Sequence, residues 1–362
     1  MTVGRDIAAL TSAFAVGIIT AGFIPIYSVS FFSASVVATA LLPLSLYVYS
    51  HKENSGIFPH AIPIFLLAGL ICCICDTCSD FSTNAAVPHI TAALCEKFKS
   101  MIEDTAFRKE ESSALIKALL TGDRSSLPKD ITIAFRKSGA SHILALSGLH
   151  LGIIYGFISR LLSILGGHPC CMKIRTCMTI SICGIYAAAV GAGESIVRAF
   201  LFILLREAAE ISGRSKDIRH ILPAAMLIQL AADPSSIRSV SFQLSYSAMA
   251  GIAYILPSFR NMWPDNDVSG KCRIIRGIWN LASVSIACQI STFPFAWMYF
   301  RAFPVNFLIS NLIAVPLSGI AIPAAIITVL LDHVGICPDI LISCTEALFS
   351  VLTESLEIIS KF

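Results

Sequence analysis

The sequence predicts an all-α fold, a polytopic transmembrane helical bundle. Hydrophobic residues make up 56% of the 362 residues and only 14% are charged, and the mean hydropathy is +0.77. Long apolar runs recur along the chain, which is typical of proteins that use a lipid bilayer as their solvent. Inside a bilayer, helices satisfy their own backbone hydrogen bonds, so helical spans are expected.

About ten to eleven membrane segments are expected, some of them short or discontinuous. The first follows Arg5, lacks a small-residue cleavage site and precedes a second long run, so it reads as a retained helix rather than a signal peptide. Residues 195–211 and 219–232 are weak or short for a full span of about 20 residues, which places the functional centre around residues 142–245. The expected segments are 6–27, 29–49, 57–75, 142–165, 176–193, 195–211, 219–232, 237–256, 277–300, 305–331 and 340–357.

The basic residues predict a multi-pass protein of the bacterial inner membrane with a cytoplasmic N-terminus and an outer C-terminus. In that orientation thirteen of the 26 basic residues fall on the inner side. The outer side receives only Arg198, Arg238 and Arg301 in short connections, with Lys361 at the C-terminus. The other nine lie in one long outer segment, and long loops contribute little to this rule.

Three parts are predicted: N-terminal transmembrane helices in 1–78, an outer-face amphipathic helical segment in 79–141, and a transmembrane domain in 142–362. Within the outer segment, apolar residues recur at helical spacing around residues 90–102 and 127–138, the second group beginning at Pro128. We expect amphipathic helices that lie on the membrane surface. Over residues 76–141 nine basic residues balance nine acidic ones, which favours a solvated structural face over a nucleic-acid site.

The polar residues of Ser138–Gly156, SGASHILALSGLHLGIIYG, are unusual in so apolar a segment. His142 and His150 are expected on one helix, about 12 Å apart at a rise of about 1.5 Å per residue, too far to share a metal ion. Each could be a bundle histidine with its hydrogen bonds satisfied. Ser147 and His150, three residues apart, also fit the nucleophile and base of an intramembrane serine hydrolase.

Other polar residues have two interpretations each. Glu194 and Arg198 are four residues apart, so they either pair on one helix face or line a path. Gln243 and Ser245 serve either as contacts between helices or as pore lining. Cys75 and Cys78 could form a disulfide on the outer side. The nearby cysteines have no second ligand pair at finger spacing, so no metal and no cofactor are expected.

Three ordered motifs resemble the membrane domain of the ComEC family of bacterial competence proteins over roughly residues 112–330. They are GDRS followed by SGASHILALSGLH, then ESIVRA, then DPSSIRSVSFQLSYSA. The resemblance implies an inner-membrane channel for single-stranded DNA during natural transformation. It also implies partners: an outer DNA receptor, a cytoplasmic helicase-like ATPase and the lipid bilayer, with homodimer formation left open.

The family pattern is incomplete in this sequence. Larger members carry an outer OB-like domain and a C-terminal metallo-β-lactamase-like domain, and we expect neither here, because residues 76–141 are too few and too helical and no HxHxDH motif occurs. Moving one phosphate across the whole membrane against an inside-negative potential of 100 mV costs about 2.3 kcal/mol. The sequence has no GxxxxGK[ST] loop for binding a nucleotide, so we expect an external motor to drive import. We expect no enzymatic activity of the chain itself.

The sequence therefore favours a DNA conduit, with a small-solute or proton-coupled transporter and a serine hydrolase as the alternatives. The three outer cations Arg198, Arg238 and Arg301 are expected to surround the entrance of the path and to bind DNA phosphates there. The candidate channel-lining or DNA-contacting residues are His142, Ser147, His150, Glu194, Arg198, Arg238, Gln243, Ser245 and Arg301.

Overall fold

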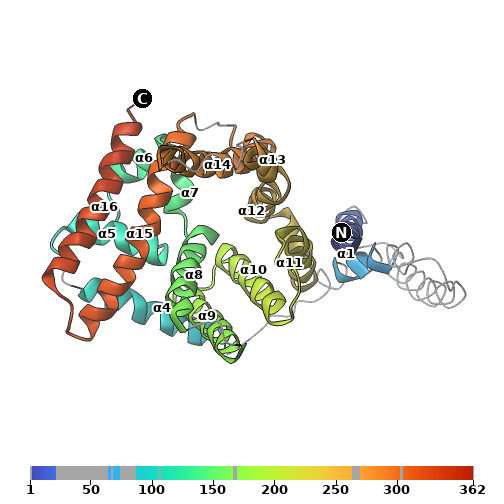
Figure 1. Ribbon diagram of the computed structural model, residues 1–362, viewed down its shortest axis with the longest axis horizontal. Helices are drawn as coiled ribbons and strands as arrows, with labels where there is room; N and C mark the ends of the chain where they lie inside the picture. The colour runs from blue at the N-terminus through green and yellow to red at the C-terminus, as the bar shows by residue number, and fades with distance from the viewer. Residues whose placement is uncertain are drawn as a thin grey trace, which may run out of the picture. The chain divides into compact units, whose positions relative to one another are not determined.

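The computed structural model describes residues 2–21, 64–66, 68–73, 87–105, 107–165, 169–262, 270–301 and 305–361. Within these ranges the chain forms helices and short connections and no strand, so the predicted all-α class is confirmed (Figure 1). The chain divides into two compact units. Unit 1 contains Met1–Asn84 and Arg214–Tyr246, and unit 2 contains Ala85–Gly213 and Ser247–Phe362.

Unit 1 is built on α1 (Thr2–Ala21) and α11 (Ile218–Ala232), which pack against each other. Asp217 caps the start of α11 by accepting a hydrogen bond from the Arg219 backbone N–H at 3.0 Å, and such caps satisfy N–H groups that a helix start leaves open. The Thr11 hydroxyl of α1 donates to the carbonyl oxygen of Pro223 in α11 at 3.0 Å. A 3₁₀ helix, Pro234–Arg238, and the first residues of α12 (Val240–Ala250) complete the unit.

Two glycines allow α1 to approach the helical residues 64–66 and 68–73 very closely. A Cβ atom on Gly17 would lie 2.0 Å from the Leu66 carbonyl oxygen, and one on Gly69 would lie 2.1 Å from that of Phe14. Helix pairs in membranes commonly meet through small residues, because apolar side chains gain little by leaving lipid and backbone proximity supplies the attraction.

Replacing Gly69 with alanine should destabilise unit 1, because the new methyl group cannot fit beside the α1 backbone. Overpacking of this kind costs about 1–3 kcal/mol. A lower unfolding temperature and less protein in the membrane fraction are expected. The control is Gly152→Ala in α8, where nothing lies within 4 Å of the added Cβ. Equal unfolding temperatures for the two variants would contradict the close packing.

Unit 2 holds most of the helices. They are α4 (Val87–Asp104), α5 (Glu110–Thr121), α6 (Lys129–Lys137), α7 (Ser141–Leu144), α8 (Gly148–Leu162), α9 (Pro169–Ala189), α10 (Glu194–Ile211), α13 (Leu256–Asn261), α14 (Gly270–Phe300), α15 (Phe307–His333) and α16 (Asp339–Ile359). The end of α12 continues through a π-helix, Gly251–Ile255, into α13. Helices α15 and α16 lie side by side (Figure 1).

Helix α5 belongs to the core of unit 2. Its apolar residues Leu115, Ile116, Leu119 and Leu120 are buried together with side chains from α4, α6, α8, α9, α10, α15 and α16. Polar contacts fix the same helices, since the Thr328 and Thr345 hydroxyls of α15 and α16 lie 2.9 Å apart. These apolar side chains fill the interior that the helices of unit 2 share.

The start of α5 is held by a residue from the far end of the chain. No side chain of its own caps this helix. Glu346 of α16 is buried, and its Oε1 atom accepts hydrogen bonds from the backbone N–H groups of Arg108 and Lys109, the latter at 2.8 Å. A carboxylate at a helix start satisfies open N–H groups and complements the positive end of the helix dipole.

The two amphipathic helices expected in the outer segment are present as α4 and α6. The predicted face of the second is buried, with Leu127, Ile131, Phe135 and Ser138 at 8% exposure or less. These side chains and Ile102 of α4 pack into the protein core, whereas Leu94 of α4 is exposed. A location of the two helices on the membrane surface stays a prediction. Helix α5, between them, was not predicted.

Two described helices are long and apolar enough to cross a membrane, Ile275–Phe300 and Phe307–His333. Shorter apolar helices include Ile7–Ala21, Gly148–Leu162 and Ile218–Ala232. The expected segment 29–49 lies outside the described residues. A bundle of ten or eleven membrane segments therefore stays a prediction.

Candidate functional site

The polar segment around residues 141–150 is broken between two helices. Helix α7 ends at Leu144, Ala145 and Ser147 have extended backbone with ψ of 129° and 171°, and α8 begins at Gly148. The expectation of one continuous span over 142–165 is therefore wrong, and so is the placement of His142 and His150 on a single helix. His142 is exposed on α7, whereas His150 is fully buried in the first turn of α8.

Ser147 and His150 form a reciprocal cap at the start of α8. The Ser147 Oγ atom accepts from the Leu149 backbone N–H at 3.3 Å, and the Ser147 backbone N–H donates to His150 Nδ1 at 3.3 Å. An accepting Nδ1 assigns the ring proton to Nε2. His150 thus takes the place of the glutamate or glutamine that usually completes such a cap.

A second motif, the GDRS loop, reaches the same break. Gly122 ends α5 in the left-handed conformation, with φ of 78°, and its Cβ position would lie 3.3 Å from the Leu146 side chain. The Arg124 Nη2 atom donates to the Leu144 carbonyl oxygen at 3.1 Å, at the end of α7. The fold therefore brings the GDRS and SGASHILALSGLH motifs into contact.

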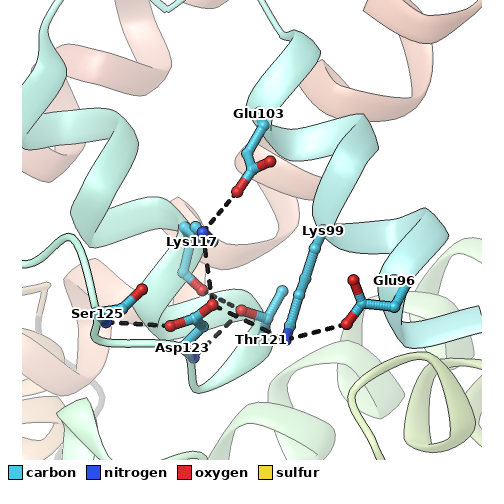
Figure 2. Close-up of polar contacts among 7 residues, drawn as sticks. All are labelled: Glu96, Lys99, Glu103, Lys117, Thr121, Asp123 and Ser125. Carbon is cyan, nitrogen blue, oxygen red and sulfur yellow. Dashed lines mark hydrogen bonds and ion pairs between the residues drawn. The ribbon is translucent and has the colours of Figure 1, made fainter. Parts of the chain in front are cut away.

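Ion pairs hold the GDRS loop in place, as Figure 2 shows. The Asp123 carboxylate lies 3.4 Å from Lys117 Nζ and 3.8 Å from Lys99 Nζ, and Lys117 also binds Glu103 at 2.6 Å. Hydrogen bonds from the Ser125 hydroxyl and backbone N–H, together with the Lys117 charge, lower the pKa of Asp123 from 3.8 to about 2. The hydrogen bond to Glu103 raises the pKa of Lys117. With these shifts Asp123 and Lys117 are both charged at neutral pH.

Asp123→Asn should weaken the loop and change its response to acid. The pKa of Asp123 is lower in the folded protein than its ordinary value, so its contribution to stability is present above about pH 4 and is lost as the pH falls toward about 2. We expect a lower unfolding temperature at pH 7 for the variant and a smaller loss between pH 4 and 2.

The control for this measurement is Asp104→Asn, at the exposed end of α4. It should leave both the unfolding temperature and its acid dependence unchanged. Parallel pH curves for Asp123→Asn and the wild-type protein would contradict the assigned role of Asp123.

Of the two interpretations of Glu194 and Arg198 on α10, the structure contains the pair. Arg198 Nη1 lies 3.7 Å from Glu194 Oε2, and Nη2 donates to the Ser195 hydroxyl at 3.0 Å. Arg198 is 1% exposed, so in this structure its guanidinium group lies in the protein interior. A Cβ on Gly148 would lie 3.2 Å from the Ala199 Cβ, which places the start of α8 against the same part of α10.

The other predicted residues belong to other elements of the chain. Arg301 follows α14, is exposed and has a left-handed backbone with φ of 51°. Arg238, Gln243 and Ser245 belong to unit 1, where Arg238 is exposed and Gln243 Nε2 donates to the Ile237 carbonyl oxygen at 2.9 Å. Cys75 and Cys78 lie outside the described residues.

The Ser147 and His150 contact bears on the hydrolase alternative. The Ser147 Oγ and His150 Nδ1 atoms are 3.3 Å apart, but Nδ1 also accepts the Ser147 backbone N–H. A general base needs an orienting group on its other ring nitrogen. Among the described residues, no hydrogen-bond partner reaches His150 Nε2. The arrangement fits a helix cap.

Ser147→Ala should destabilise α8 by about 0.5–2 kcal/mol, the usual effect of losing a cap. Ser147→Thr keeps a hydroxyl and should retain most of the stability. Wild-type protein should not react with a fluorophosphonate probe at Ser147. Covalent labelling at Ser147 that disappears in Ser147→Ala would instead support the hydrolase alternative.

Two buried carboxylates were not identified from the sequence. Glu346 caps α5, and Glu207 of α10 is 4% exposed between α8 and α9. The available signal for Glu207 was an acidic residue within REAAE at the end of an apolar run. Its partners come from other helices and have no fixed spacing in the sequence.

The fold and the site define an all-helical protein with apolar helices in which two polar motifs meet at a helix break. The chain belongs to the competence protein family: residues 119–362 match the model of that family. The family predicted from the motifs is confirmed.

Three relatives show how much of the chain is shared. The chain is 23% identical over 222 residues to ComE operon protein 3 of Bacillus subtilis (strain 168), covering 61% of this chain and 27% of that protein. It is 24% identical over 227 residues to the uncharacterized protein YcaI of Escherichia coli (strain K12), covering 62% and 29%. It is 28% identical over 175 residues to an uncharacterized protein of Aquifex aeolicus (strain VF5), covering 47% and 39%.

The matched part thus spans 27% to 39% of the length of these relatives. No solved structure matches the chain.

Proposed function

We propose that this chain takes part in DNA uptake during natural transformation and forms, or helps form, a path for single-stranded DNA across the bacterial inner membrane. The observation that carries the proposal is the family match over residues 119–362, which includes both motifs that meet at the α7–α8 break. A relative with 23% identity carries the name ComE operon protein 3.

The placement of charge in α8, α9 and α10 supports an orientation for this path. Arg160 lies in the last turn of α8, Lys173 and Arg175 near the start of α9, and Arg206 near the end of α10. Since α9 runs opposite to its two neighbours, these cations share one end of the three helices. Cations are enriched on the cytoplasmic side, so that end is inside and the α7–α8 break faces outward.

Energetics support a conduit that depends on partners. Moving each phosphate across the full field costs about 2.3 kcal/mol per 100 mV of inside-negative potential, so import needs an external source of free energy. The proposal therefore includes an outer DNA receptor that delivers the strand and a cytoplasmic helicase-like ATPase that draws it in. The chain itself is assigned transport and no catalytic step, and its assembly as a homodimer is a further part to be tested.

Deletion of the gene should abolish entry of labelled DNA into the cytoplasm and leave DNA bound at the cell surface. Double-stranded DNA carrying a label is added to competent cells, and DNase-resistant and cytoplasmic label are measured separately. Restoring the wild-type gene should restore entry. Normal entry in the deletion strain, in a host that takes up DNA under the same conditions, would remove DNA import as the function.

Variants in the same assay test the outer cations. Arg238 and Arg301 are exposed, so Arg238→Gln combined with Arg301→Gln removes charge with little effect on packing. Reduced entry at an unchanged protein level is expected, because phosphates would lose cationic contacts. The control is Arg136→Gln, an exposed cation on α6. Entry at the wild-type level in the double variant would exclude these two arginines from the path.

A further inference from the structure

Three helices of unit 2, α8, α9 and α10, are held at a common level by a buried carboxylate. The Tyr155 hydroxyl of α8 donates to the Oε1 atom of Glu207 in α10 at 2.6 Å. The Thr176 hydroxyl of α9 donates to its Oε2 atom at 2.9 Å. Tyr155, Thr176 and Glu207 therefore lie side by side, and the position of other residues along each helix follows from them.

Three cations lie close to this level, toward one end of the helices. Arg160 is five residues beyond Tyr155 in α8, and Lys173 is three residues before Thr176 in α9. At a rise of about 1.5 Å per residue they lie about 7.5 Å and about 4.5 Å from the level, in the same direction because α9 runs opposite to α8. The Arg206 guanidinium lies at the level itself, 5.9 Å from the centre of the Tyr155 ring. We call these three residues the cationic band.

The charges of the cationic band are open to a ligand. Arg160, Lys173 and Arg206 are exposed, and among the described residues no ion pair joins any of them to an acidic side chain. The two acidic residues beside them are engaged, since Glu207 accepts the two hydroxyl groups and Glu210 pairs with Arg175 of α9 at 3.3 Å. Three positive charges from three helices thus face outward at one end.

An exposed apolar face begins beside the cationic band and leads away from it along α9. Its side chains recur every three or four residues, so they share one side of the helix. Each is at least 38% exposed, and they are Ile174, Met178, Ile182 and Ile185. The first of them directly follows Lys173. Positive charge at one end of an apolar face matches a molecule with an anionic head and hydrocarbon chains.

We propose that the cationic band binds the headgroup of an anionic phospholipid whose acyl chains lie along the exposed face of α9. Lysine and arginine form charge-assisted hydrogen bonds with phosphate oxygens, and basic sites between membrane helices bind anionic headgroups. Nucleic-acid phosphates would meet the same charges, but they have no hydrocarbon chain for the apolar face. The proposal shares with the proposed function the placement of these helices in a membrane, and it does not depend on the DNA path.

Binding of fluorescent phosphatidylglycerol to the purified full-length chain in a non-ionic detergent tests the site. A cation near a charged lipid surface contributes about fivefold to affinity. The triple variant Arg160→Gln, Lys173→Gln and Arg206→Gln should therefore bind about 100-fold more weakly than the wild type. Arg160→Lys combined with Arg206→Lys keeps the charges and should retain binding.

The matched control removes three exposed cations from another helix of unit 2. It combines Lys129→Gln, Arg136→Gln and Lys137→Gln in α6 and should bind as tightly as the wild type. If size-exclusion chromatography shows that the triple variant of the cationic band does not fold, Lys173→Gln alone replaces it, with about fivefold weaker binding expected. Wild-type affinity in the folded variant would overturn the proposal.

Competition identifies the ligand. Unlabelled phosphatidylglycerol should displace the fluorescent lipid, whereas phosphatidylcholine, inorganic phosphate and a single-stranded oligonucleotide at the same concentration should not. Equal displacement by phosphatidylcholine would show that the headgroup charge is not recognised, and equal displacement by phosphate or the oligonucleotide would show that no lipid is required. Either result would overturn the proposal. DNA entry is not measured, so failure here leaves the proposed function untouched.

Discussion

Where α7 ends and α8 begins, backbone N–H and C=O groups have no partner within a helix. Because apolar side chains surround them, their hydrogen-bond partners must come from the few polar side chains nearby. An unsatisfied N–H or C=O group in such surroundings is unfavourable, and three polar side chains near the break supply partners. The side chains of Ser147 and His150 accept hydrogen bonds from backbone N–H groups at the start of α8. Arg124 donates to the Leu144 carbonyl oxygen at the end of α7. The GDRS loop is positioned for this task by Asp123 and its two lysines.

The side chains that satisfy the backbone groups at the break also have a consequence for the proposed transport. Backbone groups that are bonded to protein side chains hold the break in one conformation. Backbone groups bonded to water would not, because water molecules can enter and leave. Ser147, His150 Nδ1 and Arg124 are therefore already bonded to backbone groups near the break, and Arg198 is paired to Glu194. In the proposed conduit, DNA phosphates would meet exposed groups first and these internal contacts only after rearrangement.

Apolar runs predicted most helices well, because burial and lipid exposure both require them. The expected segments 195–211 and 219–232 correspond to Glu194–Ile211 and Ile218–Ala232, each beginning beside a residue suited to a helix start, Gly193 or Asp217. The break within 142–165 could not be seen from hydropathy, since Ala145 and Leu146 are as apolar as the helices around them. The serine that caps α8 was visible, but a serine within a span has the same appearance.

The site was predicted unevenly for a related reason. His150 and Ser147 stood out because they are polar within an apolar segment, and both lie at the break. Glu207 and Glu346 did not stand out, because each lies where charged residues are common and its partners come from distant helices. Such contacts depend on tertiary packing, which a single sequence reports only through motifs such as GDRS.

The capping of α5 by Glu346 also imposes an order on folding. Helix α5 occupies the middle of the unit 2 core, yet the carboxylate that completes its start is on α16, more than two hundred residues later in synthesis. Until α16 has been made, the N–H groups at the start of α5 lack this partner. A truncation that removes α16 would therefore weaken a helix that lies far from it in the sequence.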